Sequence, residues 1–509
     1  MSHPVISADT RKGNRELRED APGFDKHNRR RNRCTHSAIA HLLIAATLAG
    51  CAINPVTGDR ELALISEDQE IAMGRDAAQQ VSSSLGLVEN AALQQYVSGV
   101  GLELARTSER PDLPWEFHVV DDPTPNAFAL PGGYIYVTRG LLTLMNSEAE
   151  LAAVLGHEIG HVTARHSVSQ LSQAQLAQLA LGIGMIASPE LRQFGELANT
   201  GLSLLFLKFG RDDERQADEL GFQYMLAHQY DVREMRDVFV ALQSSGELAG
   251  QSPIPSWLAS HPGPPDRIAA VQERISALET PQQAVKINAR SYLERLDGVV
   301  YGSDPRHGFF EDGYFYHPEL AFQFLVPESW RKQNLTAAVL AISPNQDAAL
   351  QLTLTQGDAA QGALSFFEES GAVAIESPES TEINGHEAMV SRFQAETPNG
   401  AVRGLAAHIE FGEVTYRLVT FAPMGAYQSQ ETLFRQIIGS FSPATDRDVL
   451  DVQARRLQII ELDRDMTLSE FEKDYPSTDL SIEELAVINQ VEGPSSTLKG
   501  GAAAKRVIG

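Results

Sequence analysis

Apolar and polar positions follow two different periods along the chain, one helical and one extended. Apolar side chains recur at three-to-four spacing over residues 66–85 and 89–107, which predicts two amphipathic helices. Alternating positions predict strands at 115–120, 127–130 and 134–138, and a Gly-Gly pair between the last two indicates a hairpin. A small sheet flanked by helices is therefore expected in this part of the chain.

Helical periodicity continues after this sheet. Ser147 and Glu150 have the spacing of a capping box, so a helix is expected to begin near Ser147. Residues 167–207, 214–227 and 266–278 also have helical patterns, and several prolines precede the last of them. The first half of the chain is therefore expected to be mostly helical.

The pattern changes in the second half. Residues 312–445 alternate polar and apolar side chains in many short runs, with one helical segment near 430–438. This predicts an α+β domain with a largely antiparallel sheet. The last segment, about 450–509, is shorter and ends in a stretch rich in glycine and alanine.

The N-terminus has the pattern of a secretory signal. A basic stretch at 29–33 precedes an apolar run at 38–49, which is too short for a transmembrane span. The run ends in Leu-Ala-Gly before Cys51, which resembles the bacterial lipobox, so cleavage would remove Cys34 and leave a lipid-modified Cys51. The alternative is an ordinary signal peptide with an incidental cysteine. Ala52 stands where an Asp would resemble an inner-membrane retention signal, which favours the outer membrane of a Gram-negative bacterium.

Composition narrows the kinds of partner and metal site. The chain has 509 residues, a formal net charge of -26 and two cysteines, Cys34 and Cys51. This acidity argues against nucleic-acid binding, which needs clusters of Lys and Arg. A high negative charge keeps a protein soluble, and this explains the acidity. Because both cysteines lie near the N-terminus, any metal in the rest of the chain must be held by His, Asp or Glu.

His157 and His161 lie four residues apart on the helix expected to begin near Ser147. Positions four apart share one face of a helix, so both imidazoles point to one place, as in a recurring zinc site. Glu158 lies about 100° around the helix, where it can act as general base on a water. The alternative is a chance pattern in which two surface histidines lie on a helix.

A zinc site needs a third protein ligand. His166 comes nine residues after His157, which places it about 180° away on a continuous helix. Glu214 is the better candidate, and Asp218 follows it by four residues on the same face. Asp218 would accept a hydrogen bond from a ligating histidine and fix its tautomer. This downstream pair favours a metal site over chance.

These motifs resemble the HtpX/BepA-type family of zinc metallopeptidases, which includes the CAAX prenyl proteases. The segments that carry the resemblance are GHEIGHVTARH at 156–166 and RDDERQAD at 211–218. NAFALPGG at 126–133 resembles the strand before the family's active-site helix, and NPVTG at 54–58 resembles the start of its periplasmic lipoprotein members. The resemblance covers about residues 52–280.

The resemblance implies roles for particular residues and a fold for the domain. One zinc ion per chain would be bound by His157, His161 and Glu214, with Glu158 as general base and Asp218 beside the site. The domain would be mostly helical and of the zincin type, with a small β-hairpin or sheet.

The resemblance also implies a substrate strand and a latch. An extended peptide would bind by main-chain hydrogen bonds, with broad sequence tolerance, beside a strand formed by Asn126, Ala127, Phe128 and Ala129. His261 lies in a Ser-His-Pro segment, and in BepA-like members the histidine there can approach the zinc and hold the enzyme latent. The alternative is a loop or helix-entry histidine.

The C-terminal half resembles other modules. Residues 313–330 resemble the opening of small PsbP/Mog-like α+β domains, which are usually interaction modules, and not the helical-repeat domain of BepA-like enzymes. Residues 466–501 are weakly similar to a LysM repeat, a module that binds peptidoglycan. The alternative is a capping subdomain with no ligand.

The predicted fold class is α+β, with six segments along the chain. They are a lipoprotein signal peptide at 1–50, a tether at 51–66, a zinc metallopeptidase domain at 67–280, a linker at 281–311, a PsbP/Mog-like α+β domain at 312–445 and a small LysM-like or capping module at 446–509. The resemblance implies a zinc-dependent metalloendopeptidase, lipid-anchored in the periplasm, that degrades misfolded or unassembled envelope proteins. The alternatives are a latent protease that acts as an outer-membrane protein assembly chaperone and a cell-wall-associated scaffold.

Overall fold

The computed structural model describes residues 51–181, 208–249, 257–278, 285–397 and 400–509. The predicted signal peptide at 1–50 lies outside the described residues, as do the end of the predicted helix at 167–207 and the first residues of the predicted linker. The chain forms two compact units, 1–52 and 53–509, and the sites below belong to the second. Among the residues that the structure describes, no helix is both long and apolar enough to cross a membrane.

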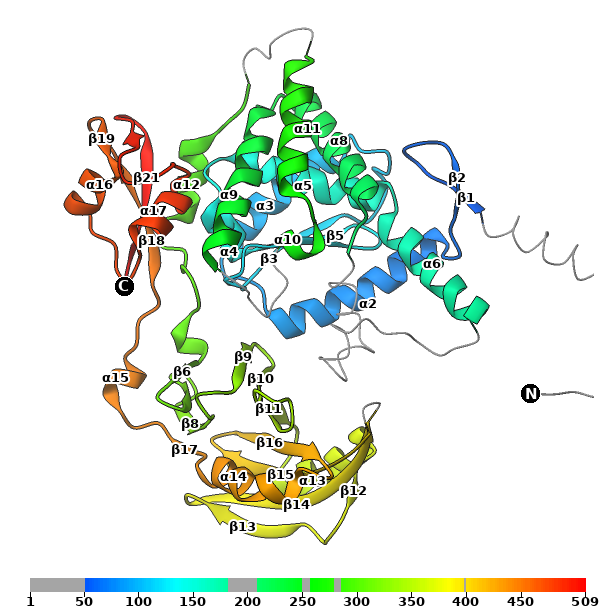
Figure 1. Cartoon of the computed structure of the whole chain (residues 1–509), viewed down its shortest axis with the longest axis vertical. Helices are drawn as coiled ribbons and strands as arrows, with labels where there is room; N and C mark the ends of the chain where they lie inside the picture. The colour runs from blue at the N-terminus through cyan, green and yellow to red at the C-terminus, as the bar shows by residue number, and fades with distance from the viewer. Residues whose placement is uncertain (1–50, 182–207, 250–256, 279–284, 398–399) are drawn as a thin grey trace, which may run out of the picture. The chain divides into compact units, whose positions relative to one another are not determined.

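A three-stranded sheet and two helices come first in the second unit (Figure 1). The first elements are β1 (Cys51–Ile53), β2 (Arg60–Leu62), α2 (Glu67–Leu85), α3 (Ala91–Ala105), β3 (Glu116–Val120), β4 (Ala127–Leu130) and β5 (Tyr134–Thr138). The predicted hairpin is confirmed, because β4 and β5 pair antiparallel around Gly132 and Gly133, whose φ angles of 81° and 105° favour glycine. β5 also pairs in parallel with β3, so β4 lies at an edge of this sheet.

Helices follow, with α5 at the centre of the group (Figure 1). They are α4 (Arg139–Leu144), α5 (Glu148–Thr163), α6 (His166–Leu181), α8 (Arg211–Ala227), α9 (Arg233–Ala249), α10 (Trp257–Ser260), α11 (Pro264–Ser276) and α12 (Ala289–Leu296). α5 packs against α3, α8, α9 and β4, and all of its residues after Glu148 are buried. Ser147 caps α5, as predicted, but the carboxylate of Glu150 accepts a hydrogen bond from the backbone of Asn146 instead of returning to Ser147.

Glycines let α5 and α8 approach each other backbone to backbone. A Cβ on Gly156 would lie 3.1 Å from the Cα of Gly221, and a Cβ on Gly160 would lie 3.0 Å from the Cα of Ala217. These distances are shorter than ordinary van der Waals contact, so larger residues would push the two helices apart. The close approach brings side chains of α8 within reach of His157 and its neighbours on α5.

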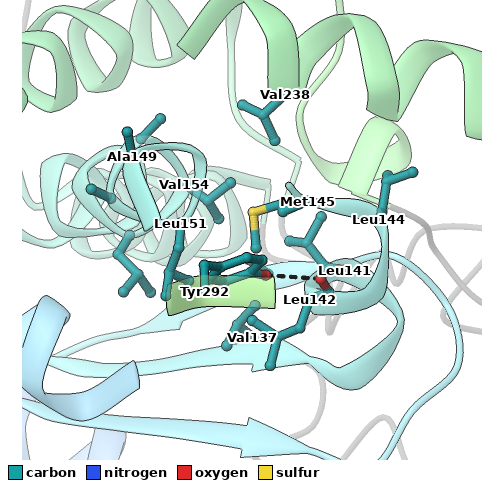
Figure 2. Packing of buried hydrophobic residues seen from close by; sticks show 14 of the residues in the cluster. Val137, Leu141, Leu142, Leu144, Met145, Ala149, Leu151, Val154, Val238 and Tyr292 are labelled. Atoms are coloured by element: carbon teal, nitrogen blue, oxygen red, sulfur yellow. Dashed lines mark hydrogen bonds between the residues drawn. The ribbon is translucent and has the colours of Figure 1, made fainter. Parts of the chain in front are cut away.

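The core beside α5 also takes in α12, which lies in the predicted linker. Figure 2 shows the Tyr292 ring among Val137, Met145, Leu151 and other apolar side chains. Its hydroxyl donates a 2.8 Å hydrogen bond to the carbonyl of Leu142, which satisfies the only polar atom of the buried ring. The helical region therefore continues past residue 280.

An antiparallel sheet domain follows, as the alternating pattern predicted. Its elements after the short 3-10 helix η3 (Pro305–His307) are β6 (Phe309–Glu311), β7 (Tyr314–His317), β8 (Phe322–Leu325), β9 (Arg331–Leu335), β10 (Ala338–Ile342), β11 (Ala349–Thr355), α13 (Ala359–Ser370), β12 (Val373–Ala374), β13 (Glu379–Ile383), β14 (His386–Thr397), β15 (Gly400–Phe411), β16 (Val414–Pro423), α14 (Tyr427–Gly439) and β17 (Ser442–Pro443). The larger sheet has the order β12-β14-β15-β16-β11-β10-β9, with β13 paired to β14, and the smaller has the order β17-β8-β7-β6. The main hydrophobic cluster of this domain, which includes Phe315, Leu418 and Phe434, contains only its own residues.

The last segment shares its core with the helices around α5. It consists of α15 (Arg447–Leu450), β18 (Arg456–Glu461), β19 (Met466–Thr467), α16 (Leu468–Asp474), α17 (Ile482–Ile488), β20 (Thr497–Leu498) and β21 (Ala503–Ile508). β18 pairs antiparallel with β21. Phe471, Leu485 and Val507 belong to the same buried cluster as Leu151 and Tyr292. The domain boundaries stated above stay predictions.

Candidate active site

The three residues predicted as metal ligands meet in the interior of the helical region. Nε2 of His157 lies 3.0 Å from Nε2 of His161, because the two side chains leave α5 one turn apart on the same face. Glu214 reaches them from α8: its Oε1 lies 3.4 Å from Nε2 of His161 and its Oε2 lies 3.6 Å from Nε2 of His157. Two helices therefore supply three donor side chains to one point.

His261 joins this group from the end of α10. Its Nδ1 lies 3.2 Å from Nε2 of His157 and 2.9 Å from Oε1 of Glu214. One donor atom from each of His157, His161, Glu214 and His261 lies within 4.8 Å of the others, and all four residues are buried. The His261 ring stacks on Trp257, with centroids 4.8 Å apart, which holds the ring in this place.

The spacing of these donors fits one metal ion. Nitrogen and oxygen ligands lie about 2.0–2.1 Å from zinc at tetrahedral corners, which puts them about 3.4 Å from one another. The five individual separations given above, from 2.9 to 3.6 Å, bracket that value, and all four donor atoms lie within 4.8 Å of one another. Oδ1 of Asp218 lies 2.8 Å from Nδ1 of His157 and accepts a hydrogen bond from its N–H, so a lone pair on Nε2 faces the neighbouring imidazoles. A cation between the nitrogens removes the repulsion between their lone pairs.

Charge states in the site suit metal binding at neutral pH. Burial and the nearby guanidinium of Arg267 lower the pKa of His157 to about 3, so its imidazole is neutral. Burial acts to raise the pKa of Glu214, but His261 and His161 outweigh it and hold that pKa well below the usual range. Neutral imidazole and ionised carboxylate are the forms that bind a metal.

Glu158 is the acidic group of the site that could act as general base. Its side chain is fully buried, and neither carboxylate oxygen has a hydrogen-bond partner among the described residues. Oε1 lies 3.6 Å from Nε2 of His261. Burial raises the pKa of Glu158 to about 7, which suits a group that takes up and releases a proton near neutral pH.

Arg267 on α11 was not identified from the sequence, although it contacts two of the carboxylates. Its Nε donates to Asp218 over 2.8 Å, and its Nη1 lies 2.9 Å from Oε2 of Glu214. The guanidinium lies 4.3 Å from the ring centres of both Phe239 and Trp257. Burial would raise the pKa of Asp218, but Arg267 lowers it to about 2. Its sequence neighbours gave no signal of this role, because an arginine on an amphipathic helix is ordinarily exposed.

His166 lies outside the group of four donors, as predicted, but the reason given for that prediction is wrong. It assumed a continuous helix, but α5 ends at Thr163, Arg165 has a φ of 59°, and α6 begins at His166. Nδ1 of His166 therefore lies 2.9 Å from Nδ1 of His161. His166 is outside the group of four donors and contacts the opposite side of the His161 ring.

The residues predicted to align a substrate lie at the edge of the small sheet, next to α5. Ala127 and Phe128 of β4 are buried, and Ala129 is half-buried. Asn126 precedes β4, and its backbone N–H donates to the hydroxyl of Thr138. No described strand pairs with the outer edge of β4. Cys51 lies in β1, and the structure does not describe its side chain.

Known proteins are similar to this region of the chain. Residues 91–275 match the model of Peptidase family M48. Mitochondrial metalloendopeptidase OMA1 of Schizosaccharomyces pombe is 32% identical over 223 residues, which are 43% of this chain and 65% of that protein. The Beta-barrel assembly-enhancing protease of Yersinia pestis is 29% identical over 262 residues, which are 49% of this chain and 52% of that protein. The chain thus spans between about half and two thirds of the length of these relatives.

Solved structures add little. Cyanobacterial PsbP from Synechocystis sp. PCC 6803 is similar to 26% of this chain and 91% of its own, with 14% identity and a TM-score of 0.23. A likeness at that score does not assign a fold, so the PsbP/Mog-like domain stays a prediction.

The four donor residues and Arg267 all lie within residues 91–275, so the candidate metal centre belongs to the part of the chain that is similar to peptidase family M48.

Proposed function

We propose that this protein is a zinc-dependent metalloendopeptidase of the HtpX/BepA type that holds one zinc ion per chain. The observation that carries the proposal is the group of four buried donor atoms within 4.8 Å of one another, beside the carboxyl of Glu158, which has no hydrogen-bond partner among the described residues. A buried carboxylate without a hydrogen bond destabilises a fold, so its presence next to metal ligands favours a catalytic role. The relatives named metalloendopeptidase and protease agree with this function.

The residues divide the work of peptide hydrolysis among them. His157, His161 and Glu214 would hold zinc, which makes a water acidic near neutral pH and polarises a carbonyl. Glu158 would take the proton of the attacking water and return it to the leaving amine. Asp218 accepts from Nδ1 of His157 and so keeps Nε2 available as a ligand.

A substrate peptide would lie along β4. No described strand pairs with the outer edge of β4, so an extended peptide can pair there as an added strand, beside Asn126, Ala127, Phe128 and Ala129. Main-chain hydrogen bonds depend little on the side chains of the substrate, so we expect cleavage of many unfolded chains. β4 packs on α5, which supports the placement of a paired peptide near His157.

The first test compares the wild type with Glu158→Gln on an unfolded protein. We expect cleavage to fall by about 10²–10⁴-fold while the zinc content stays near one per chain, because the variant keeps the ligands and loses the base. Glu116→Gln, on an exposed position of β3, is the matched control and should cleave normally. Equal cleavage by the wild type and Glu158→Gln would refute the mechanism.

We further propose that the protein is anchored by a lipid on Cys51 in the periplasm, at the outer membrane, and degrades misfolded or unassembled envelope proteins. The signal-like N-terminal pattern supports the anchor, and the Yersinia pestis relative is named for β-barrel assembly. Cys51→Ala should abolish labelling with a radioactive fatty acid and move the protein from the membrane to the soluble fraction. Unchanged labelling would exclude the anchor.

A second candidate is a latent protease that acts mainly as an assembly chaperone. It is favoured by His261, whose Nδ1 takes a fourth donor position while its Nε2 faces Glu158 at 3.6 Å. In that place the ring excludes the water that Glu158 would activate. His261→Ala should therefore raise basal proteolysis, whereas His307→Ala, at a partly exposed position away from the site, should not. Unchanged or lower activity in His261→Ala would end the latency proposal.

A further inference from the structure

The C-terminal end of α5 receives hydrogen bonds from donors outside the helix. The last carbonyls of a helix have no partner within it. The carbonyl of Val162 accepts a 3.0 Å hydrogen bond from Nη1 of Arg110, and the carbonyl of Ala164 accepts a 3.2 Å hydrogen bond from Nδ2 of Asn54. His161, one of the four metal donors, lies directly before these two carbonyls.

Asn54 is held so that its amide nitrogen faces Ala164. Its Oδ1 accepts from the backbone N–H groups of Val56 at 2.8 Å and Thr57 at 3.2 Å. Its own backbone N–H donates to the carbonyl of Asp59 over 2.8 Å, which closes the turn, and the side chain is buried. The amide oxygen thus accepts hydrogen bonds within the turn, and the amide nitrogen donates one to the end of α5. Neither Asp nor Ser can supply this combination of acceptor and donor.

A second tie joins the segment that follows to the same helix end. Nη2 of Arg165 donates to the carbonyl of Ile65 over 2.9 Å, and its Nε donates to Glu70 over 2.9 Å. Glu70 is 1% exposed and also binds Nη1 of Arg110 at 2.7 Å. The segment 54–70 therefore contacts the end of α5 through both its first residue and its last residues.

We propose that residues 54–70 form a brace for the C-terminal turn of α5, and that Asn54 is a positioning residue for the metal donor His161. Without Asn54, the Ala164 carbonyl would lose its donor and the last turn of α5 would open more often. His161 would then spend less time at the 3.0 Å separation from His157 that metal binding needs. The metal in this inference rests on the proposed function, whereas the brace itself is independent of it.

The test is Asn54→Asp, which has the same shape and still accepts from Val56 and Thr57 but cannot donate to Ala164. The matched control is Asn384→Asp, because the Asn384 amide donates to the carbonyls of Gly439 and Phe441 in the separate sheet domain. Zinc affinity is measured by competition with a chelator, and hydrogen exchange is followed at the amides of residues 161–166. We expect Asn54→Asp to bind zinc about three- to tenfold more weakly and to exchange faster there, and Asn384→Asp to change neither.

Unchanged zinc affinity and unchanged exchange in Asn54→Asp would overturn the proposal. If Asn54→Asp does not fold, Arg165→Met breaks the tie to Ile65 and Glu70 and carries the same two expectations. Failure of the proposed function is distinguishable: if the wild type binds zinc but cleaves no more than Glu158→Gln, the peptidase proposal fails while a zinc deficit in Asn54→Asp supports the brace. If the wild type binds no zinc, local exchange alone decides whether the brace exists.

Discussion

Two buried polar clusters lie along α5, and they are built in opposite ways. At the first turn, Glu150 accepts from Gln490 over 2.8 Å, and Nζ of the fully buried Lys505 donates to three backbone carbonyls at the end of α4, over 2.7, 3.3 and 2.9 Å. Further along the helix, imidazole nitrogens face one another and Glu158 has no hydrogen-bond partner among the described residues.

The difference separates a structural cluster from a functional one. Buried polar groups stabilise a fold when each has a partner, and they destabilise it when one is left alone. The Glu150–Gln490–Lys505 cluster satisfies its donors and acceptors and joins the last segment to α5. The metal-donor cluster has polar atoms without hydrogen-bond partners among the described residues. Such a cluster stabilises the fold less and is typical of a functional site.

The largest expected effect is on the structural cluster. Lys505→Met would remove the ammonium that donates to three buried carbonyls, of which that of Leu144 keeps a second donor in Gln490, so we expect the free energy of unfolding to fall by about 2–4 kcal/mol. Urea unfolding measures it, with Lys499→Met as control, because Lys499 lies at the surface in an exposed ion pair. A loss no greater than that of the control would mean that Lys505 is not a structural partner and would remove the contrast between the clusters.

The stability of the wild type and of Glu150→Gln, measured over a range of pH, tests the role of Glu150 in the structural cluster. Burial raises the pKa of this carboxyl to about 8. The folded state then holds a proton between pH 4.5 and about 8 that the unfolded state releases, so this group contributes stability at low pH that is lost as pH rises through that window. Relative to Glu150→Gln, the wild type should lose stability between pH 5 and pH 8. Parallel curves for the two proteins would contradict the assignment.

The smallest expected effect is at Glu158. Glu158→Gln replaces an unpartnered buried carboxyl with a neutral amide of the same shape, so metal-free protein should gain about 1 kcal/mol or stay unchanged at pH 8. Thermal unfolding in the presence of a chelator measures this change. A substantial loss of stability would show that Glu158 supports the fold, and would make the two clusters alike.

Local patterns predicted much of the site before the structure. The cap at Ser147, the four-residue spacing of His157 and His161, and the same spacing of Glu214 and Asp218 are all features of single helices. Each is visible in a short window because the helical period fixes which side chains share a face. The structure brings these side chains together at one point.

Contacts between distant segments could not be predicted in this way, because no short window of the sequence contains both partners. Asn54 meets Ala164 across 110 residues, and Lys505 meets Thr143 across 362. Arg267 gave no local hint that two aromatic rings enclose its guanidinium. The continuous helix assumed for His166 fails for a local reason instead, since the left-handed conformation of Arg165 ends the helical phase before that residue.

The position of Lys505 also bears on the order in which this protein can fold. At a synthesis rate of about 5–20 residues per second, its 362-residue separation from Thr143 corresponds to roughly 20–70 s between the appearance of α4 and the arrival of the side chain that caps it. During that interval the start of α5 lacks its final support. We therefore expect the helical core to close only after β21 emerges, which delays assembly of the metal centre until residues 503–508 have been synthesised.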